Sequence, residues 1–371
     1  MKQVLMFCRQ NVVLCVSFLL ALGSAFLVHP SREYFSYIDF RTLSILLSLM
    51  LVVMGLRTLG LFRSVGKWLL EKTGTVRSLS LVLVCLNFFF SMFITNDVAL
   101  ITFVPFTVEV FFMAGLNACL IRVLVLQTIA ANLGSMLTPI GNPQNIYLYS
   151  KSGLSMGAFL KLMLPYSAVA LLLLILLTVL LTKPEKTEVT LRWENTLGRH
   201  RGKLALYLFL FLFSLTAVTN LLPYYLVLAV VVLVVLLSDW HVLLRADYVL
   251  LLTFVFLFIF IGNMKHSTVI SDWLMSSISG NELLSAVLVS QVISNVPAAI
   301  LLSGFTEQVP ALIVGTNLGG LGTLIASMAS LITYNFYIRT HNPQKGKYFA
   351  VFTAWNLVFL AVLLLVTQLV A

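Results

Sequence analysis

Long apolar runs separated by short polar segments extend along the whole sequence. A run of about 18 residues or more predicts a transmembrane helix, because it is long enough to cross roughly 30 Å of hydrocarbon. The recurrence of such runs indicates an all-α polytopic membrane protein. The predicted spans cover about 11–28, 42–60, 118–148, 160–182, 204–222, 224–238, 248–263, 310–337 and 349–370.

Two further apolar stretches, 79–114 and 283–308, are interrupted by polar, helix-breaking residues. The first contains Thr95-Asn96-Asp97, and the second contains Ser294-Asn295-Val296-Pro297. As one straight helix, 79–114 would extend about 54 Å, which is too long for one crossing. Each stretch is therefore either a kinked span or a hairpin with the polar residues at its tip.

The distribution of charge favours the hairpin. The segment 183–203 is rich in Lys and Arg, which is typical of a cytoplasmic loop. A single crossing at 79–114 would put it outside, whereas a hairpin keeps it inside. With an N-terminus that is cytoplasmic beside Lys2 and Arg9, all but five of the 23 Lys and Arg residues lie inside. A cleaved signal peptide ending near residue 25 would leave this topology unchanged.

Composition agrees with a membrane protein. Hydrophobic residues make up 60% of the chain and charged residues only 10%, against about 25% charged in soluble domains. The net charge of +10 comes from basic residues in short loops, which argues against nucleic-acid binding. No nucleophile–base pair or metal-ligand spacing is present, so we expect neither an enzyme nor a metal cofactor.

The two halves of the chain repeat one order of features: a span with Gly near its end, a hairpin with Asn at its tip, and a span carrying Asn-Leu-Gly. We expect an N-terminal span and loop (1–41), repeat 1 (42–182), a cytoplasmic linker (183–203) and repeat 2 (204–371). The first hairpin would open inward and the second outward, so the repeats would be inverted, as in many transporters. The matching segments are Met54-Gly55 with Ile261-Gly262, Thr95-Asn96-Asp97 with Ser294-Asn295-Val296, and Asn132-Leu133-Gly134 with Asn317-Leu318-Gly319.

Non-helical backbone at membrane depth is tolerated where it lines a wet cavity or is buried in protein. Carbonyl groups at the end of a half-helix suit a cation, and N–H groups at the start of the next suit an anion. Asp97 is an acid in an apolar stretch and so is a candidate for Na+ or proton binding, although it would also suit a helix N-cap. The segment 132–145 breaks the predicted span 118–148, and its Gly-rich counterpart 315–323 breaks the span 310–337, so we expect both broken helices at the candidate site. The alternative for the Gly residues is close packing between helices.

Four segments resemble the ion transporter superfamily, which includes arsenite permeases, NhaD-type sodium/proton antiporters, citrate permeases and divalent-anion/sodium symporters. The first two look most like the arsenite permease and NhaD members. Pro297 departs from the Ser-Asn-Thr tip of dicarboxylate symporters and weakens that assignment. The segments are TNDVALITFVPF (95–106), NLGSMLTPIGNPQNIYL (132–148), SNVPAAILL (294–302) and NLGGLGTLIAS (317–327).

This resemblance implies an elevator-type carrier in the cell membrane, commonly a homodimer. We expect a secondary active transporter that moves a small anion coupled to Na+ or H+; the alternatives are a Na+/H+ antiporter and an arsenite or oxyanion efflux permease. The candidate Na+ ligands are Thr95, Asn96, Ser294 and Asn295. The implied substrate and ion site also includes Asp97, Asn132, Thr138, Gly141, Asn142, Pro143, Asn317, Gly319 and Thr323.

Overall fold

The computed structural model describes residues 7, 11–187 and 200–370, without the side chains of 269 and 270. Over that range it is helical and contains no sheet, which confirms the all-α fold. Nine of the described helices are long and apolar enough to cross a membrane. The predicted cytoplasmic N-terminus with Lys2 and Arg9, and residues 188–199 of the predicted linker, lie outside the described residues.

Side-chain caps start several helices of the first half. Asp39 caps α4 by accepting a hydrogen bond from the N–H of Thr42 at 3.0 Å. Thr75 and Ser78 form a reciprocal capping box at the start of α6. The helices are α2 (Val12–Ser24), α3 (Tyr34–Tyr37), α4 (Phe40–Thr58), α5 (Leu61–Leu70), α6 (Val76–Ile94), α7 (Asn96–Met113), α8 (Asn117–Ser135), α9 (Pro143–Ser152) and α10 (Met156–Leu181).

The second half follows a similar order. Asp247 caps α13 through the N–H of Leu250 at 3.0 Å, as Asp39 caps α4. The helices are α11 (Arg201–Val218), α12 (Tyr224–Leu243), α13 (Tyr248–Lys265), α14 (Thr268–Ile278), α15 (Glu282–Ile293), α16 (Asn295–Leu302), α17 (Val309–Leu318), α18 (Met328–Ile338) and α19 (Lys345–Val370).

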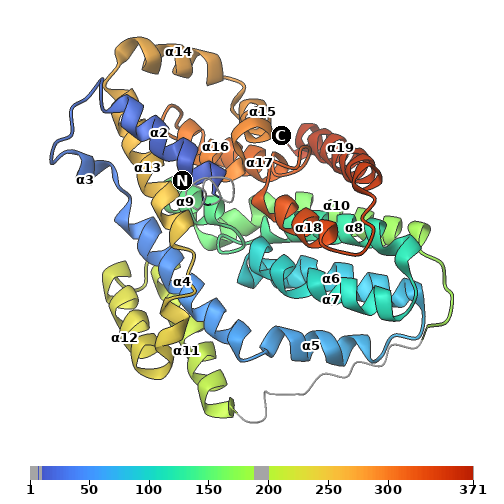
Figure 1. Cartoon of the computed structure of the whole chain (residues 1–371). Helices are drawn as coiled ribbons and strands as arrows, with labels where there is room; N and C mark the ends of the chain where they lie inside the picture. The colour runs from blue at the N-terminus through green and yellow to red at the C-terminus, as the bar shows by residue number, and fades with distance from the viewer. Residues whose placement is uncertain (1–6, 8–10, 188–199, 371) are drawn as a thin grey trace.

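Two short helices occupy segments that the sequence pattern presented as polar loops. Helix α5 lies in the basic segment after the second span, and α14 lies in the predicted loop 264–282. Both helices are short and carry polar residues among the apolar ones, so a search for apolar runs of span length does not detect them. Helices α5 and α14 lie at opposite ends of the molecule in Figure 1.

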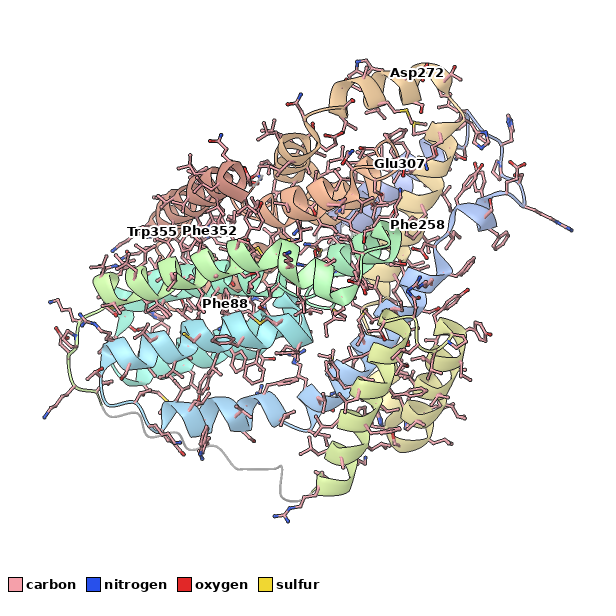
Figure 2. The ribbon with its side chains drawn as sticks, turned by 180° about the vertical axis from the view of Figure 1, so that it is seen from behind. Phe88, Phe258, Asp272, Glu307, Phe352 and Trp355 are labelled. Atoms are coloured by element: carbon pink, nitrogen blue, oxygen red, sulfur yellow. The ribbon has the colours of Figure 1, made fainter. Side chains whose placement is uncertain are left out.

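The helices form two groups. In the first, α2 packs against α13, and α4 packs against α11 and α12. In the second, α6 packs along α8, α15 along α17, and α10 and α19 cover α8. Phe88 of α6 and Phe352 of α19 are fully buried in the second group (Figure 2). Contacts of α4 with α9 and of α13 with α16 join the groups, and the segment that links α8 to α9 is largely buried between them (Figure 1).

Candidate functional site

The two predicted breaks have the same backbone geometry. Thr95 separates α6 from α7 with φ 71° and ψ 151°, and Ser294 separates α15 from α16 with φ 75° and ψ 154°. This region of backbone space is occupied almost only by Gly, and another residue there costs about 1–3 kcal/mol. Such strain persists where the surrounding structure imposes it, and it concentrates at functional sites. The two turns, which we call tip 1 and tip 2, therefore have equivalent backbone conformations, and both are candidates for a functional role.

Each tip is held against a broken helix of its own half. The first break lies between Ser135 at the end of α8 and Pro143 at the start of α9, and the second lies between α17 and α18. At tip 1 the N–H of Asn96 donates to the Gly141 carbonyl at 3.2 Å. At tip 2 the N–H of Asn295 donates to the Ala326 carbonyl at 2.9 Å. The same backbone contact thus occurs once in each half.

The two breaks are joined by a reciprocal pair of hydrogen bonds. The amide of Asn142, the N-cap residue of α9, donates to Asn317 Oδ1 at 3.0 Å. The hydroxyl of Ser327, which occupies the same position before α18, donates to Asn132 Oδ1 at 2.9 Å. Each contact joins residues 175 or 195 positions apart in the chain. The Asn of each predicted Asn-Leu-Gly segment therefore binds the break of the other half.

Both tips converge on this junction. The amide of Asn96 also donates to Asn132 Oδ1, at 3.1 Å, so tip 1 and Ser327 share one acceptor. Tip 2 binds the carbonyl of Ala326, the residue before Ser327. Four helix N-termini (α7, α9, α16, α18) and four C-termini (α6, α8, α15, α17) consequently lie in one region. Such a region offers N–H groups to an anion and carbonyl groups to a cation.

The remaining predicted residues mainly stabilise the breaks. The Thr138 hydroxyl donates to the carbonyl of Met92 on α6. The N–H of Thr323 donates to Gln291 Oε1 at 2.9 Å, and the Gln291 amide donates to the Gly319 carbonyl at 2.9 Å. At Gly141 an added Cβ would lie 2.0 Å from the Ser135 carbonyl, so only glycine fits the turn.

A cavity of about 130 Å³ lies beside tip 1. Three of the predicted site residues line it, namely Thr95, Asp97 and Pro143, whereas the predicted site residues of repeat 2 do not. The oxygen Oδ1 of Asp97 is buried and has no hydrogen-bond partner among the described residues. A carboxylate oxygen in such a position is costly unless a cation or proton meets it.

Sequence reasoning missed several residues at the site. Arg57, Arg245 and Asp247 also line the cavity, but each lies at a helix end where charge is unremarkable in sequence. Gln291 binds the second break, whereas Ser327 belongs to that break and binds Asn132. A signal for Ser327 existed in its place before an apolar helix, where Ser is a preferred N-cap. Among the described residues there is no group of three His, Cys, Asp or Glu that could hold a metal ion.

The apolar spans, the strained tips and the broken helices define a multi-pass membrane transporter. Residues 5–310 match the sequence profile of the CitMHS family, described as citrate transporters. The chain belongs to this family, and it is a secondary transporter rather than an enzyme.

Relatives of the chain agree with this assignment. Inner membrane protein YbiR of Escherichia coli is 32% identical over 85% of this chain and 84% of its own length. An uncharacterized transporter of Methanocaldococcus jannaschii is 29% identical over 87% of both chains. A silicon efflux transporter of Oryza sativa subsp. japonica is 31% identical over 38% of this chain and 28% of its own length.

Proposed function

We propose that this transporter moves a small anion across the membrane, coupled to Na+ or H+, at the junction of the two tips and the two breaks. The observation that carries the proposal is the reciprocal bonding of Asn142 to Asn317 and of Ser327 to Asn132. Those bonds draw eight helix ends to one region, where a small ion would meet unwound backbone from both halves.

The electrostatics of this region favour an anion accompanied by a cation. The N-termini of α7 and α16 begin at the tips, and each contributes partial positive charge. The C-terminal carbonyls of α6 and α15 end at the same tips and suit Na+. Thr95, Asn96, Ser294 and Asn295 are the candidate Na+ ligands, since hydroxyl and amide oxygens are available there.

Asp97 is the candidate carrier of the coupling charge. Its unpartnered oxygen lies beside the cavity that Arg57 and Arg245 also line. Asp97 and Asp247 balance the formal charge of these two arginines, so a cation or proton at Asp97 leaves the cavity with net positive charge, which attracts an anion. A cation or proton on Asp97 would lower the cost of an anion nearby, which is the physical basis of coupling.

The paired tips and breaks support an inverted-repeat architecture with an elevator mechanism. In this proposal the second helix group, which holds both hairpins and both broken helices, moves as a unit against α2, α4, α11, α12 and α13. A homodimer formed through the first group would anchor that motion. Crosslinking of cysteines across the α4–α9 contact would slow transport without preventing ligand binding, and unchanged rates in crosslinked protein would contradict the elevator.

The test is anion uptake by purified protein in liposomes under an imposed Na+ or H+ gradient, with citrate, sulfate and arsenite as probes. Wild-type protein should accumulate at least one anion only when a gradient is present. The Asp97→Asn variant should lose this dependence, while Glu109→Gln should retain it, because Glu109 is an exposed acid on the same helix. Absence of gradient-driven flux for every probe, or equal coupling in Asp97→Asn, would contradict the proposal.

Two alternatives have specific support. The unpartnered oxygen of Asp97 also suits a Na+/H+ antiporter, in which Na+ addition would drive proton release without an anion. The similarity to a silicon efflux transporter and to a putative transporter of Dictyostelium discoideum named arsB suits efflux of a hydroxylated oxyanion such as arsenite. A dye-reported proton signal identifies the first, and arsenite resistance of a sensitive host identifies the second.

A further inference from the structure

A second polar recess lies far from the tips, at the end of α7. Two cavities of about 390 and 470 Å³ lie between α7 and the turn that joins α18 to α19. Both are lined by Phe112, Thr340 and His341, so they adjoin each other, and we call the pair the α7–α18 cleft. None of the candidate transport residues lines it.

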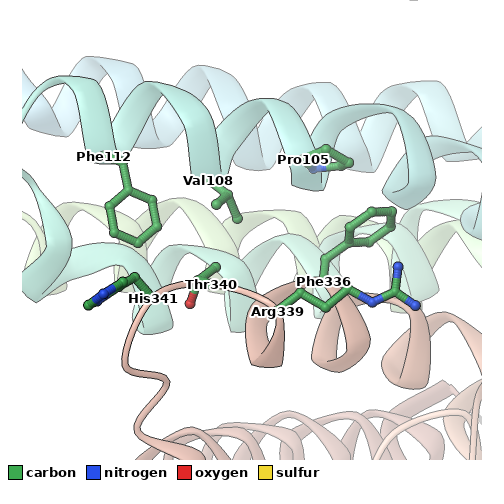
Figure 3. Close-up of a pocket in the computed structure, with 7 residues that line it drawn as sticks. All are labelled: Pro105, Val108, Phe112, Phe336, Arg339, Thr340 and His341. Atoms are coloured by element: carbon green, nitrogen blue, oxygen red, sulfur yellow. The ribbon is translucent and has the colours of Figure 1, made fainter.

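One wall of the cleft is apolar and follows a membrane-spanning helix. Pro105, Val108 and Phe112 occur at intervals of three and four residues, so they share one face of α7. From Pro105 to Phe112 this face extends about 10 Å along the helix axis. Figure 3 shows the three side chains in a row facing the opposite wall, where Phe336 adds a second aromatic ring.

The other wall is basic. It carries Arg339, His341 and Lys347, and the cleft has no Asp or Glu among its lining residues. Glu109 follows Val108 in sequence but does not line the cleft. No ion pair within the described residues involves these three basic side chains. The cleft therefore joins unneutralised positive charge to an apolar groove.

We propose that the α7–α18 cleft binds one anionic phospholipid. Its headgroup lies against the basic wall, and one acyl chain lies along the apolar face of α7. The cleft lies at the end of α7 and the start of α19, two helices that are long and apolar enough to cross a membrane, and basic pockets between spans suit lipid headgroups. A soluble phosphate compound would use the basic wall alone, whereas a lipid also covers the apolar one.

The position of the cleft links the lipid to the moving parts of the protein. Helix α7 begins directly after tip 1 and α18 begins directly after Ser327, and the two helices are in contact. A lipid in the cleft contacts the far ends of these two helices, whose N-termini meet at the candidate site. Anionic lipid is therefore expected to raise transport rate as well as stability, whatever the cargo is.

The test is titration of detergent-solubilised protein with short-chain phosphatidylglycerol, followed by native mass spectrometry and by the thermal unfolding midpoint. Each basic residue beside an anionic lipid contributes a factor of roughly five in affinity, so Arg339→Gln with Lys347→Gln should weaken binding about thirtyfold. Phe112→Asp is a second variant. Phe112 is 37% exposed and lies in the last turn of α7, so the change removes little buried packing, and the new carboxylate repels the lipid.

The matched control is Lys183→Gln with Lys186→Gln, which removes the same charge from exposed residues outside the cleft and should leave binding unchanged. Phosphatidylcholine and glycerol phosphate should produce no comparable shift. Equal binding of phosphatidylcholine, or an equal loss of binding in the control, would overturn the proposal. An equal effect of glycerol phosphate would also overturn it, and would assign the cleft to soluble phosphate compounds.

Discussion

Gly134 provides a sharp test of the packing that positions tip 1. It lies on α8, two residues after Asn132, where α8 runs along α6. A Cβ added there would lie 2.0 Å from the carbonyl oxygen of Phe88 and 2.6 Å from Ser91 Oγ. The Ser91 hydroxyl can rotate away, but a backbone carbonyl within a helix cannot.

The magnitude follows from these distances. Because Cβ contacts below 3.0 Å essentially do not occur, α6 would have to move about 1.0 Å from α8 in Gly134→Ala. Overpacking of this kind costs about 1–3 kcal/mol or more, and the better helix propensity of Ala offsets about 1 kcal/mol. Because the clash is with a backbone carbonyl, we take the upper end of that range, about 3 kcal/mol, and expect a net loss of about 2 kcal/mol in the free energy of unfolding. The same shift would lengthen the 3.1 Å bond from Asn96 to Asn132 beyond hydrogen-bonding range.

The assay combines thermal unfolding in detergent with flux in liposomes. Gly134→Ala should lower the unfolding midpoint and abolish most transport. Gly157→Ala is the control, because no atom lies within 4 Å of the added methyl group, and its stability should be unchanged or slightly higher. If Gly134→Ala matched wild type in both stability and flux, the close packing of α6 on α8 would be wrong.

Three further predictions concern the second half and the cavity. Gly319→Ala should cost about 1 kcal/mol, less than Gly134→Ala, because its contacts are longer: two Ser290 side-chain atoms lie at 2.7 and 2.8 Å and the Gly315 carbonyl oxygen at 2.9 Å; unfolding midpoints test this order. Asn317→Ala should lower stability by about 1–2 kcal/mol through its lost bonds to the first break, and should reduce flux; wild-type flux would refute a role in the site. Arg57→Gln and Arg245→Gln should each raise the KM for the anion several-fold while Arg57→Lys retains it, which concentration-dependent uptake would measure.

Local sequence located most of the spans and both breaks. The predicted span 11–28 was too long, because α2 covers only Val12–Ser24, and the arms of the first hairpin, α6 and α7, are each long enough to cross a membrane. Apolar runs long enough to cross a bilayer leave few alternatives, and polar triplets inside them predicted turns where Thr95 and Ser294 lie. The repeated Asn-Leu-Gly segments likewise pointed to Asn132 and Asn317, which bond to Ser327 and Asn142 in the structure. The cytoplasmic N-terminus, the inverted orientation and the repeat boundaries stay predictions, because the structure contains no membrane to test them.

Tertiary structure alone decided which groups meet. The bonds from Asn142 to Asn317 and from Ser327 to Asn132 join segments far apart in the chain. Hydrophobic periodicity describes only residues within a few helical turns of each other, so it cannot predict such contacts. Arg57 and Arg245 reach one cavity from different helices for the same reason. Sequence determined where the helices had to break, since buried backbone and polar residues restrict that locally. Packing between helices determined that the breaks bind each other.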